Sequence, residues 1–352
     1  MLADDIKQAK TLLRRLAEGA AVSGYEENLS SLLTKEWRTL ADEVHSDGIG
    51  NTYVLKKGTV RRHQVMLAAH LDEIGLMVTA IDEKGFLRFT TVGGIDPRTL
   101  LAQEVVVHGR RDIIGVIGSV PPHLLEGGDR AVKIEDLGID VGLPVDRAKE
   151  MIQVGDPVTL RRQINELLND TMAGKALDDR AGTVVLAVCL AELARLRHQH
   201  DVIAVATVQE EVGLRGALTS AYTLNPDLAV AVDVTHGASA DTKGLTQMEL
   251  GKGPAVALGA NIHPGIYKGL CEAARQYRIP VQIEPIPGIS GTDAWAIQVT
   301  QAGIPTGLVS IPLRYMHTSV ETLDISDVVN AGKLLAYFIA NLPNDLEGFL
   351  CY

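Results

Sequence analysis

Nearly continuous apolar runs that end in acidic residues or histidines are the main regularity of this chain. Runs at 64–69, 202–208 and 228–232 predict strands covered on both faces of a sheet. Helical periodicity predicts helices at 2–18, 26–40, 181–197 and 325–342. Shorter elements complete the pattern, with strands at 52–56, 280–284 and 304–311 and helices at 215–221, 265–277 and after Asp293. This alternation predicts an α/β fold with a layered sheet flanked by helices.

The pattern changes between residue 73 and about residue 164. Short strand-like runs follow one another at 75–81, 86–92, 104–108, 113–120 and 157–161, separated by glycines and charged turns. Only 145–151 has a clear helical pattern in this stretch. Such spacing is typical of a small β-barrel or sandwich. We therefore expect a β-rich domain, 73–164, inserted between two parts of an α/β domain, 1–72 and 165–352.

Composition narrows the class of protein. The chain has 352 residues, of which 46% are hydrophobic and 22% charged, so it can bury a large core. A formal charge of −11 disfavours nucleic acid or an acidic membrane surface as the main partner. No apolar run approaches the ~18 residues of a membrane span. Three cysteines without CxxC spacing, and an N-terminus unlike a signal peptide, favour a reduced cytoplasmic location.

Two adjacent glutamates, Glu210 and Glu211, follow the apolar run 202–208. Carboxylates at the end of a buried strand repel each other, and the apolar surroundings disfavour both charges. A cation beside them would remove that cost. We interpret Glu211 as a metal ligand and Glu210 as a residue left free to transfer a proton. The simpler alternative is a Glu–Glu pair exposed on the surface.

Polar residues follow the other predicted strands as well. These residues are His70, Asp72, Asp233 and His317, and Asp178 opens a neighbouring helix. In an open α/β sheet, ligands bind at the carboxyl ends of the strands, so we expect these side chains to meet there. Because His70 and Asp72 are two positions apart, they point the same way, and one can bind metal while the other orients a ring or a water.

The expected metal ligands are two histidines and three carboxylates. Nitrogen and oxygen donors without sulfur suit zinc, cobalt or manganese better than calcium or magnesium. Five ligands exceed the needs of one tetrahedral ion and suit two ions that share a carboxylate. The alternative for Asp178 and Asp179 is capping of the next helix, with a surface pair between Asp179 and Arg180.

Several motifs together resemble those of the M42 metallopeptidases, the tetrahedral (TET) aminopeptidases once also labelled glucanase-like. They are His70-x-Asp72, Ala-Leu-Asp178-Asp-Arg180, Gln-Glu210-Glu211-Val-Gly213-x-Arg-Gly216, Val-Asp233-Val-Thr235, Ser-Gly-Thr-Asp293 and Tyr-Met-His317-Thr-Ser319. They occur in the family's order and extend over almost the whole chain. No ligand position departs from the family's pattern.

The resemblance implies a role for each position. Asp178 would bridge two metal ions, His70 and Asp233 would complete one site, and Glu211 and His317 the other. Asp72 would support His70, and Glu210 would be the general base that takes a proton from a metal-bridging water. The implied activity is removal of N-terminal residues from peptides with a free N-terminus. The family's inserted β domain is PDZ-like and mediates assembly, in dimers or hollow complexes of twelve subunits.

Two other functions compete with this interpretation. A related zinc hydrolase, such as a carboxypeptidase or deacylase on a similar scaffold, would use a similar ligand set. A scaffold or binding protein with a decayed site would not need the complete set of ligands and base.

Several polar residues are assigned to structure rather than chemistry. Ser23 and Glu26 have capping-box spacing, Asp293 has the position of a helix cap, and Arg180 is expected to pair with an acid near the site. Trp295 is expected in the core or in a pocket wall. Solvent-exposed positions are expected for His123, His198, His200 and His263, and His236 is not expected to bind metal.

Overall fold

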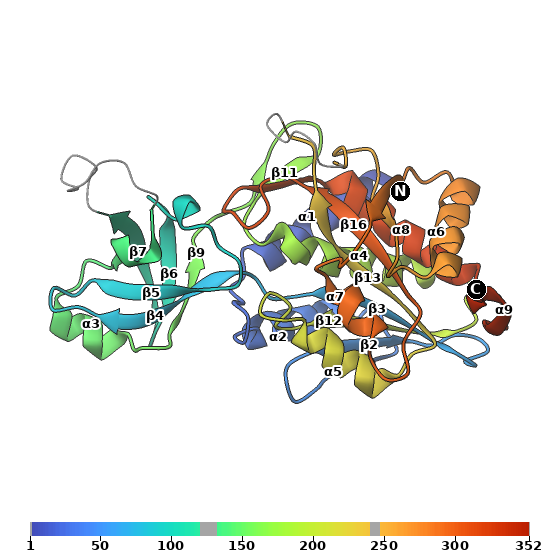
Figure 1. The fold of residues 1–352 in the computed structure, drawn as a ribbon, viewed down its shortest axis with the longest axis horizontal. Helices are drawn as coiled ribbons and strands as arrows, with labels where there is room; N and C mark the ends of the chain where they lie inside the picture. Colours follow the sequence, from blue (N-terminus) through green and yellow to red (C-terminus); the bar gives the residue numbers. More distant parts are fainter. Residues whose placement is uncertain (1, 120–131, 240–246, 352) are drawn as a thin grey trace.

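A mixed α/β part and a closed β-barrel make up the computed structural model, which describes residues 2–119, 132–239 and 247–351 (Figure 1). The barrel lies at one end of the longest axis, and the ribbon ends marked N and C both lie in the α/β part. The predicted α/β class, with a layered sheet flanked by helices, is therefore confirmed, and the sheet is mixed. None of the helices within these ranges is long and apolar enough to cross a membrane.

An eight-stranded sheet forms the centre of the α/β part. In spatial order its strands are β1 (Glu43–Ser46), β2 (Thr52–Lys56), β12 (Asp201–Thr207), β3 (Gln64–His70), β13 (Leu228–His236), β16 (Thr306–Leu313), β14 (Ala255–Gly259) and β15 (Gln282–Ile286). The middle strands β12, β3, β13 and β16 are parallel, whereas β2 and β14 run antiparallel to their central neighbours. The apolar runs predicted these central strands, although β13 continues past Val232 to His236.

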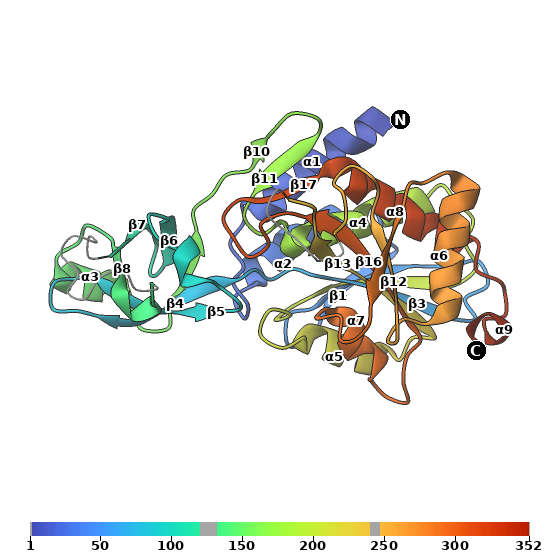
Figure 2. The ribbon, with the colours of Figure 1, turned by 45° about the horizontal axis from the view of Figure 1, so that its top comes forward.

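Helices cover both faces of this sheet. One face packs against α1 (Leu2–Ala17), α2 (Glu27–Trp37), α4 (Leu177–Leu193), α6 (Pro264–Tyr277) and α8 (Ile325–Ala340). The other face packs against α5 (Arg215–Leu224) and α7 (Asp293–Gln298), and α9 (Glu347–Leu350) contacts α6 (Figure 2). Alternate residues of β3 serve the two cores, because Leu67 belongs to the first and Met66 to the second.

The barrel has a hydrophobic core of its own. Its strands, in order around the barrel, are β4 (Gly75–Ile81), β5 (Leu87–Val92), β8 (Leu137–Asp140), β7 (Asp112–Ser119), β6 (Glu104–His108) and β9 (Pro157–Leu160). Helix α3 (Val145–Met151) and 3-10 turns at Pro97–Thr99 and Ile134–Asp136 complete this part. Of the two predicted alternatives, the structure has the barrel. Strand β8 is an addition to the prediction.

A small three-stranded sheet leads the chain back from the barrel. It consists of β10 (Asn165–Glu166), β11 (Thr171–Gly174) and β17 (Glu321–Asp324). Gly174 at the end of β11 pairs with Glu321 at the start of β17. This pairing places the beginning of α4 next to the segment that follows β16.

Candidate metal centre

The residues expected to bind metal meet at the carboxyl ends of the parallel strands. His70 is the last residue of β3, Glu210 and Glu211 follow β12, and Asp233 lies near the end of β13. Asp178 enters from the start of α4, and His317 from the segment after β16. Parallel strands that end at one edge bring these segments together.

Asp178 lies between the two histidines. Its Oδ1 is 3.1 Å from Nε2 of His70, and its Oδ2 is 3.3 Å from Nε2 of His317. Glu211 approaches the same nitrogen of His317 at 3.2 Å, and Oε2 of Glu210 lies 4.0 Å from Nε2 of His70. A carboxylate that directs one oxygen at each imidazole has the arrangement of a ligand shared by two ions.

The other ring nitrogen of each histidine, Nδ1, is hydrogen-bonded to a backbone carbonyl oxygen. Nδ1 of His70 lies 3.2 Å from the carbonyl oxygen of Asp72, and Nδ1 of His317 lies 2.8 Å from that of Gly94. A carbonyl oxygen only accepts, so Nδ1 of each ring carries a proton. Nε2, the nitrogen that faces Asp178, is therefore the one available to bind a metal ion. Metal-binding histidines are commonly oriented in this way.

Two groups of side chains place ligand atoms within 4.8 Å of one another. They are His70 with Asp178 and Glu211, and His70 with Asp179 and Asp233. Asp179 is an addition to the expected set. Its Oδ2 accepts the backbone N–H of His70 at 3.2 Å, and its Oδ1 accepts that of Gly182 at 3.0 Å. Each oxygen of Asp179 thus accepts a backbone N–H, whereas the two oxygens of Asp178 face imidazole nitrogens.

The positive charge around the carboxylates of the site is too small to keep all of them ionised. Burial, with repulsion from Asp233, Asp293 and Glu211 and against the attraction of His70, raises the pKa of Glu210 to about 10. Burial also raises the pKa of Asp233 and that of Glu211. Divalent cations would supply the missing charge, and the donors fit zinc, cobalt or manganese.

Asp72 connects the metal side of the site to the glutamate pair. Its buried carboxylate accepts the backbone N–H of Glu210 at 3.0 Å and that of Glu211 at 3.2 Å. Its Oδ1 also lies 3.6 Å from Nδ1 of His70. Ser23 donates to Oδ2 of Asp72 at 2.6 Å, so the expected capping box of α2 is wrong. The reason is that Asp72 offers the serine hydroxyl a buried acceptor.

Glu321 is a buried residue of the site that the sequence did not indicate. Its carboxylate accepts the backbone N–H groups of Leu177 at 2.7 Å, Asp178 at 3.1 Å and His317 at 2.9 Å. It therefore fixes two expected ligands that are far apart in the chain. No sequence signal marked it, because its partners are backbone groups brought close only by the pairing of β11 with β17.

Arg180 pairs with an acid, as expected, and this acid is Glu73. Arg180 is fully buried, and its Nη2 lies 3.3 Å from Glu73, which Lys175 approaches at 2.7 Å. Arg180 also donates to the carbonyl oxygens of Leu71 at 2.6 Å and Leu16 at 2.5 Å. The alternative of a surface pair with Asp179 is therefore wrong. The guanidinium joins α1 to the residue that follows His70.

Asp293 does not cap α7, whose N-cap is Thr292. Its Oδ2 instead accepts a hydrogen bond from Thr207 at 2.5 Å, at the end of β12. Its Oδ1 is buried and has no hydrogen-bond partner among the described residues. Burial raises the pKa of Asp293 to about 6, although the Thr207 bond opposes this shift. The residue thus supports the strand that carries the glutamate pair.

The histidines assigned to solvent include three that are buried. His198, His200 and His263 are all buried, and His263 is the N-cap of α6. Their expected exposure is wrong because each has a ring nitrogen near a backbone carbonyl oxygen. His236 is exposed and outside both ligand groups. His123 lies outside the described residues.

A pocket of about 270 Å³ opens onto the ligands. It is lined by His70, Asp178, Glu210, Glu211, Asp233 and His317 together with residues of β13, β15 and β16. Trp295, expected in the core or in a pocket wall, is 40% exposed and is not among the residues that line this pocket. All five expected ligands and Glu210 therefore share one accessible cavity.

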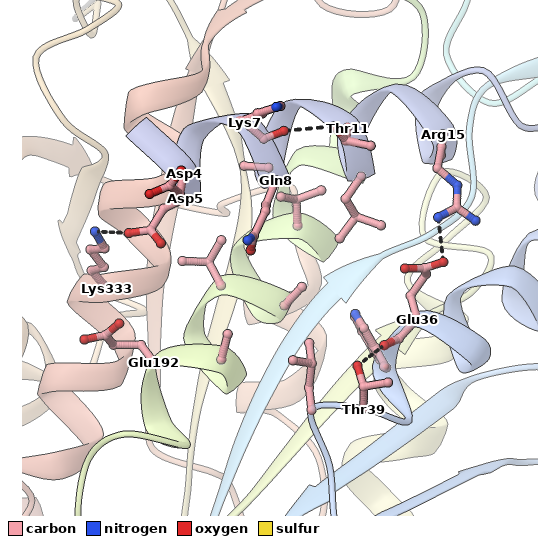
Figure 3. Close-up of a pocket in the computed structure, with 18 of the residues that line it drawn as sticks. Asp4, Asp5, Lys7, Gln8, Thr11, Arg15, Glu36, Thr39, Glu192 and Lys333 are labelled. Atoms are coloured by element: carbon pink, nitrogen blue, oxygen red, sulfur yellow. Dashed lines mark hydrogen bonds and ion pairs between the residues drawn. The ribbon is translucent and has the colours of Figure 1, made fainter. Parts of the chain in front are cut away.

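A larger pocket of about 590 Å³ lies beneath α1, beside α2 and α4 (Figure 3). Two ion pairs join its walls, Asp5 with Lys333 at 2.7 Å and Arg15 with Glu36 at 2.6 Å. No histidine is among the described residues that line it. We therefore place the chemistry in the smaller pocket.

Comparison with known proteins shows the family of this chain. The profile of the M42 glutamyl aminopeptidase family matches residues 50–334. The chain belongs to the M42 peptidase family. It is therefore a peptide hydrolase, as the motifs predicted.

Individual M42 proteins match along nearly the whole chain. The lysyl aminopeptidase of Pyrococcus furiosus is 38% identical over 338 residues, covering 94% of this chain and 96% of the relative. The structure of a TET aminopeptidase from a Thaumarchaeota archaeon has a TM-score of 0.91 and 32% identity, covering 97% of this chain and 99% of that one. The TET1 peptidase of Pyrococcus horikoshii, which can assemble into a tetrahedron or a large octahedral shell, has a TM-score of 0.84 and 32% identity, covering 95% and 100%.

Proposed function

We propose that this chain is an aminopeptidase that uses two divalent metal ions to remove the first residue of a peptide. The observation that carries the proposal is the position of Asp178, with one oxygen facing His70 and the other facing His317. In this proposal Asp178 is the shared ligand. His70 and Asp233 complete one site, and Glu211 and His317 complete the other.

Glu210 is proposed as the general base. Glu210 lines the pocket, and its backbone N–H donates to Asp72. Its carboxylate lies 4.0 Å from Nε2 of His70, which is beyond hydrogen-bond distance. The bound ions would lower the pKa of a water and stabilise the negative charge that develops on the peptide oxygen. Glu210 takes the proton of that water as its oxygen attacks the carbonyl carbon, and then gives this proton to the departing amine. Asp72 is a positioning residue.

The ions themselves are proposed to be zinc or cobalt, with manganese as a further possibility. All proposed donors are imidazole nitrogens or carboxylate oxygens, and the three cysteines lie elsewhere. Cys189 is buried within α4 and packs in the main core.

We further propose self-association through the barrel. Residues 73–164 would form an inserted PDZ-like domain between the parts 1–72 and 165–352 of the catalytic domain. Support comes from the assembly of the P. horikoshii relative and from Ile114 and Val116 on β7, two neighbouring apolar side chains exposed on the outside of the barrel. Both a dimer and a dodecamer agree with this proposal. Peptides with a free N-terminus are the proposed substrates, and the cytoplasmic location stays a prediction.

Blocking the N-terminus is the test of the proposed function. The metal-loaded protein is expected to hydrolyse short peptides that have a free α-amine and to leave their N-acetylated forms intact. Product release is measured by chromatography and mass spectrometry. Hydrolysis of the acetylated peptides at a comparable rate would instead indicate a deacylase or an endopeptidase. Release of the last residue would indicate a carboxypeptidase.

A further inference from the structure

Glu284 of β15 contributes a carboxylate to the pocket that opens onto the metal ligands. One of its oxygens, Oε1, accepts a hydrogen bond from the hydroxyl of Thr235. The other oxygen, Oε2, is buried and has no donor among the described residues. A buried acceptor without a donor destabilises the free protein. A ligand that donated a hydrogen bond to Oε2 would remove this cost.

The position of Glu284 relative to the metal ligands indicates which part of a substrate it would reach. Its partner Thr235 is two residues beyond Asp233 on β13, and both line the pocket. Two strand positions correspond to about 7 Å along the chain. The α-amine of a substrate is two bonds from the carbonyl carbon that is attacked, and must stay beside the metal ligands. A long side chain of the same residue could extend as far as Glu284.

Charge and polarity in the pocket favour a basic side chain. No lysine or arginine is among the described residues that line it, so an acidic side chain would find no ammonium or guanidinium group there. Ile286, Leu308 and Met316 also line the pocket. Apolar walls that lead to a carboxylate suit the aliphatic stem and charged end of lysine or arginine.

We propose that Glu284 binds the positively charged side chain of the substrate's first residue, and that the enzyme therefore prefers N-terminal lysine or arginine. The ammonium or guanidinium group donates to Oε2, while Thr235 continues to hold Oε1. This inference rests on the proposed aminopeptidase function and adds the class of side chain that it removes.

The test compares lysyl and norleucyl p-nitroanilides, because norleucine has lysine's four-carbon chain without the ammonium group. The metal-loaded wild-type protein is expected to have a higher kcat/KM for the lysyl substrate. In Glu284→Gln, kcat/KM for the lysyl substrate should fall by about 10- to 100-fold, the effect expected from losing a hydrogen bond between charged groups. For the norleucyl substrate the change should stay within about threefold. Glu284→Asp, which keeps the charge, should recover part of the lysyl activity.

Glu249→Gln is the matched control, because Glu249 is exposed and lies outside the pocket. Its backbone is hydrogen-bonded to the side chain of Gln282, which lies on β15 like Glu284. It removes the same charge and should leave both substrates unaffected. Equal losses for the lysyl and norleucyl substrates in Glu284→Gln would overturn the inference, because they would indicate an α-amine contact or a structural role. A wild-type enzyme without preference for lysine over norleucine would also overturn it. Failure of the proposed function itself would be distinct, since no substrate with a free amine would then be hydrolysed.

Discussion

Replacement of Glu210 by glutamine is expected to lower kcat by about 10²- to 10⁴-fold, the usual contribution of a general acid or base. Glutamine has nearly the same shape but cannot take a proton from water. Because Glu210 is not among the proposed metal ligands, the variant should keep the same metal content as the wild type. The measurements are kcat with an aminoacyl p-nitroanilide and metal content by mass spectrometry.

The neighbouring substitution Glu211→Gln is the control. Glu211 lies 3.2 Å from Nε2 of His317 and is a proposed ligand, so its loss should reduce metal content as well as activity. The adjacent variants thus separate proton transfer from metal binding. A Glu210→Gln protein that retained activity within tenfold of the wild type would refute the base assignment. So would an equal loss of metal in both variants.

Replacement of Glu73 by glutamine is expected to destabilise the folded protein by about 3–5 kcal/mol, the usual cost of removing one partner of a buried ion pair. Glu73, Lys175 and Arg180 are all buried. The neutral glutamine of the variant would leave the two cations without the negative charge that balances them. The free energy of unfolding is measured by urea denaturation of the metal-free protein. The metal-free form keeps bound ions out of the comparison.

Glu150→Gln is the control for this substitution, because Glu150 pairs with Arg147 at 2.5 Å on the exposed surface of α3. Its cost should stay below about 1 kcal/mol.

The stabilising effect of Glu73 depends on pH. Burial alone would raise the pKa of Glu73, but Lys175 and Arg180 lower it below its usual value of 4.5. The folded-state pKa lies below the unfolded one, so this contribution is present above pH 4.5 and is lost as the pH falls below it. If the Glu73→Gln protein were as stable as the Glu150→Gln protein, Glu73 would not stabilise the fold by pairing with Lys175 and Arg180.

The central strands and the clustering of the expected ligand residues could be predicted because both depend on local patterns. Strands such as β3 and β12 are buried on both faces, so their sequences are continuous apolar runs. The polar residues that follow such runs are conspicuous, and parallel strands bring them to one edge. His70, Asp178, Glu211 and Asp233 were therefore placed in one cluster from sequence, and the structure brings them together.

Residues whose role depends on tertiary contacts could not be predicted. Glu321 binds backbone N–H groups from α4 and from the segment after β16, and nothing near it in sequence indicates these partners. The edge strand β1 was also missed, because it is largely exposed and polar, with the sequence Glu-Val-His-Ser. Two of the buried histidines were misassigned for the same reason, because the carbonyl groups beside them come from distant segments: Pro343 for His200 and Leu350 for His263.

The number of metal ions bound per chain tests the central claim most directly. The purified protein is loaded with zinc, freed of excess metal by gel filtration and measured by inductively coupled plasma mass spectrometry. The five proposed ligands, with Asp178 shared between the two histidines, predict two ions per chain. A saturated protein that holds one ion or none would contradict the dinuclear centre.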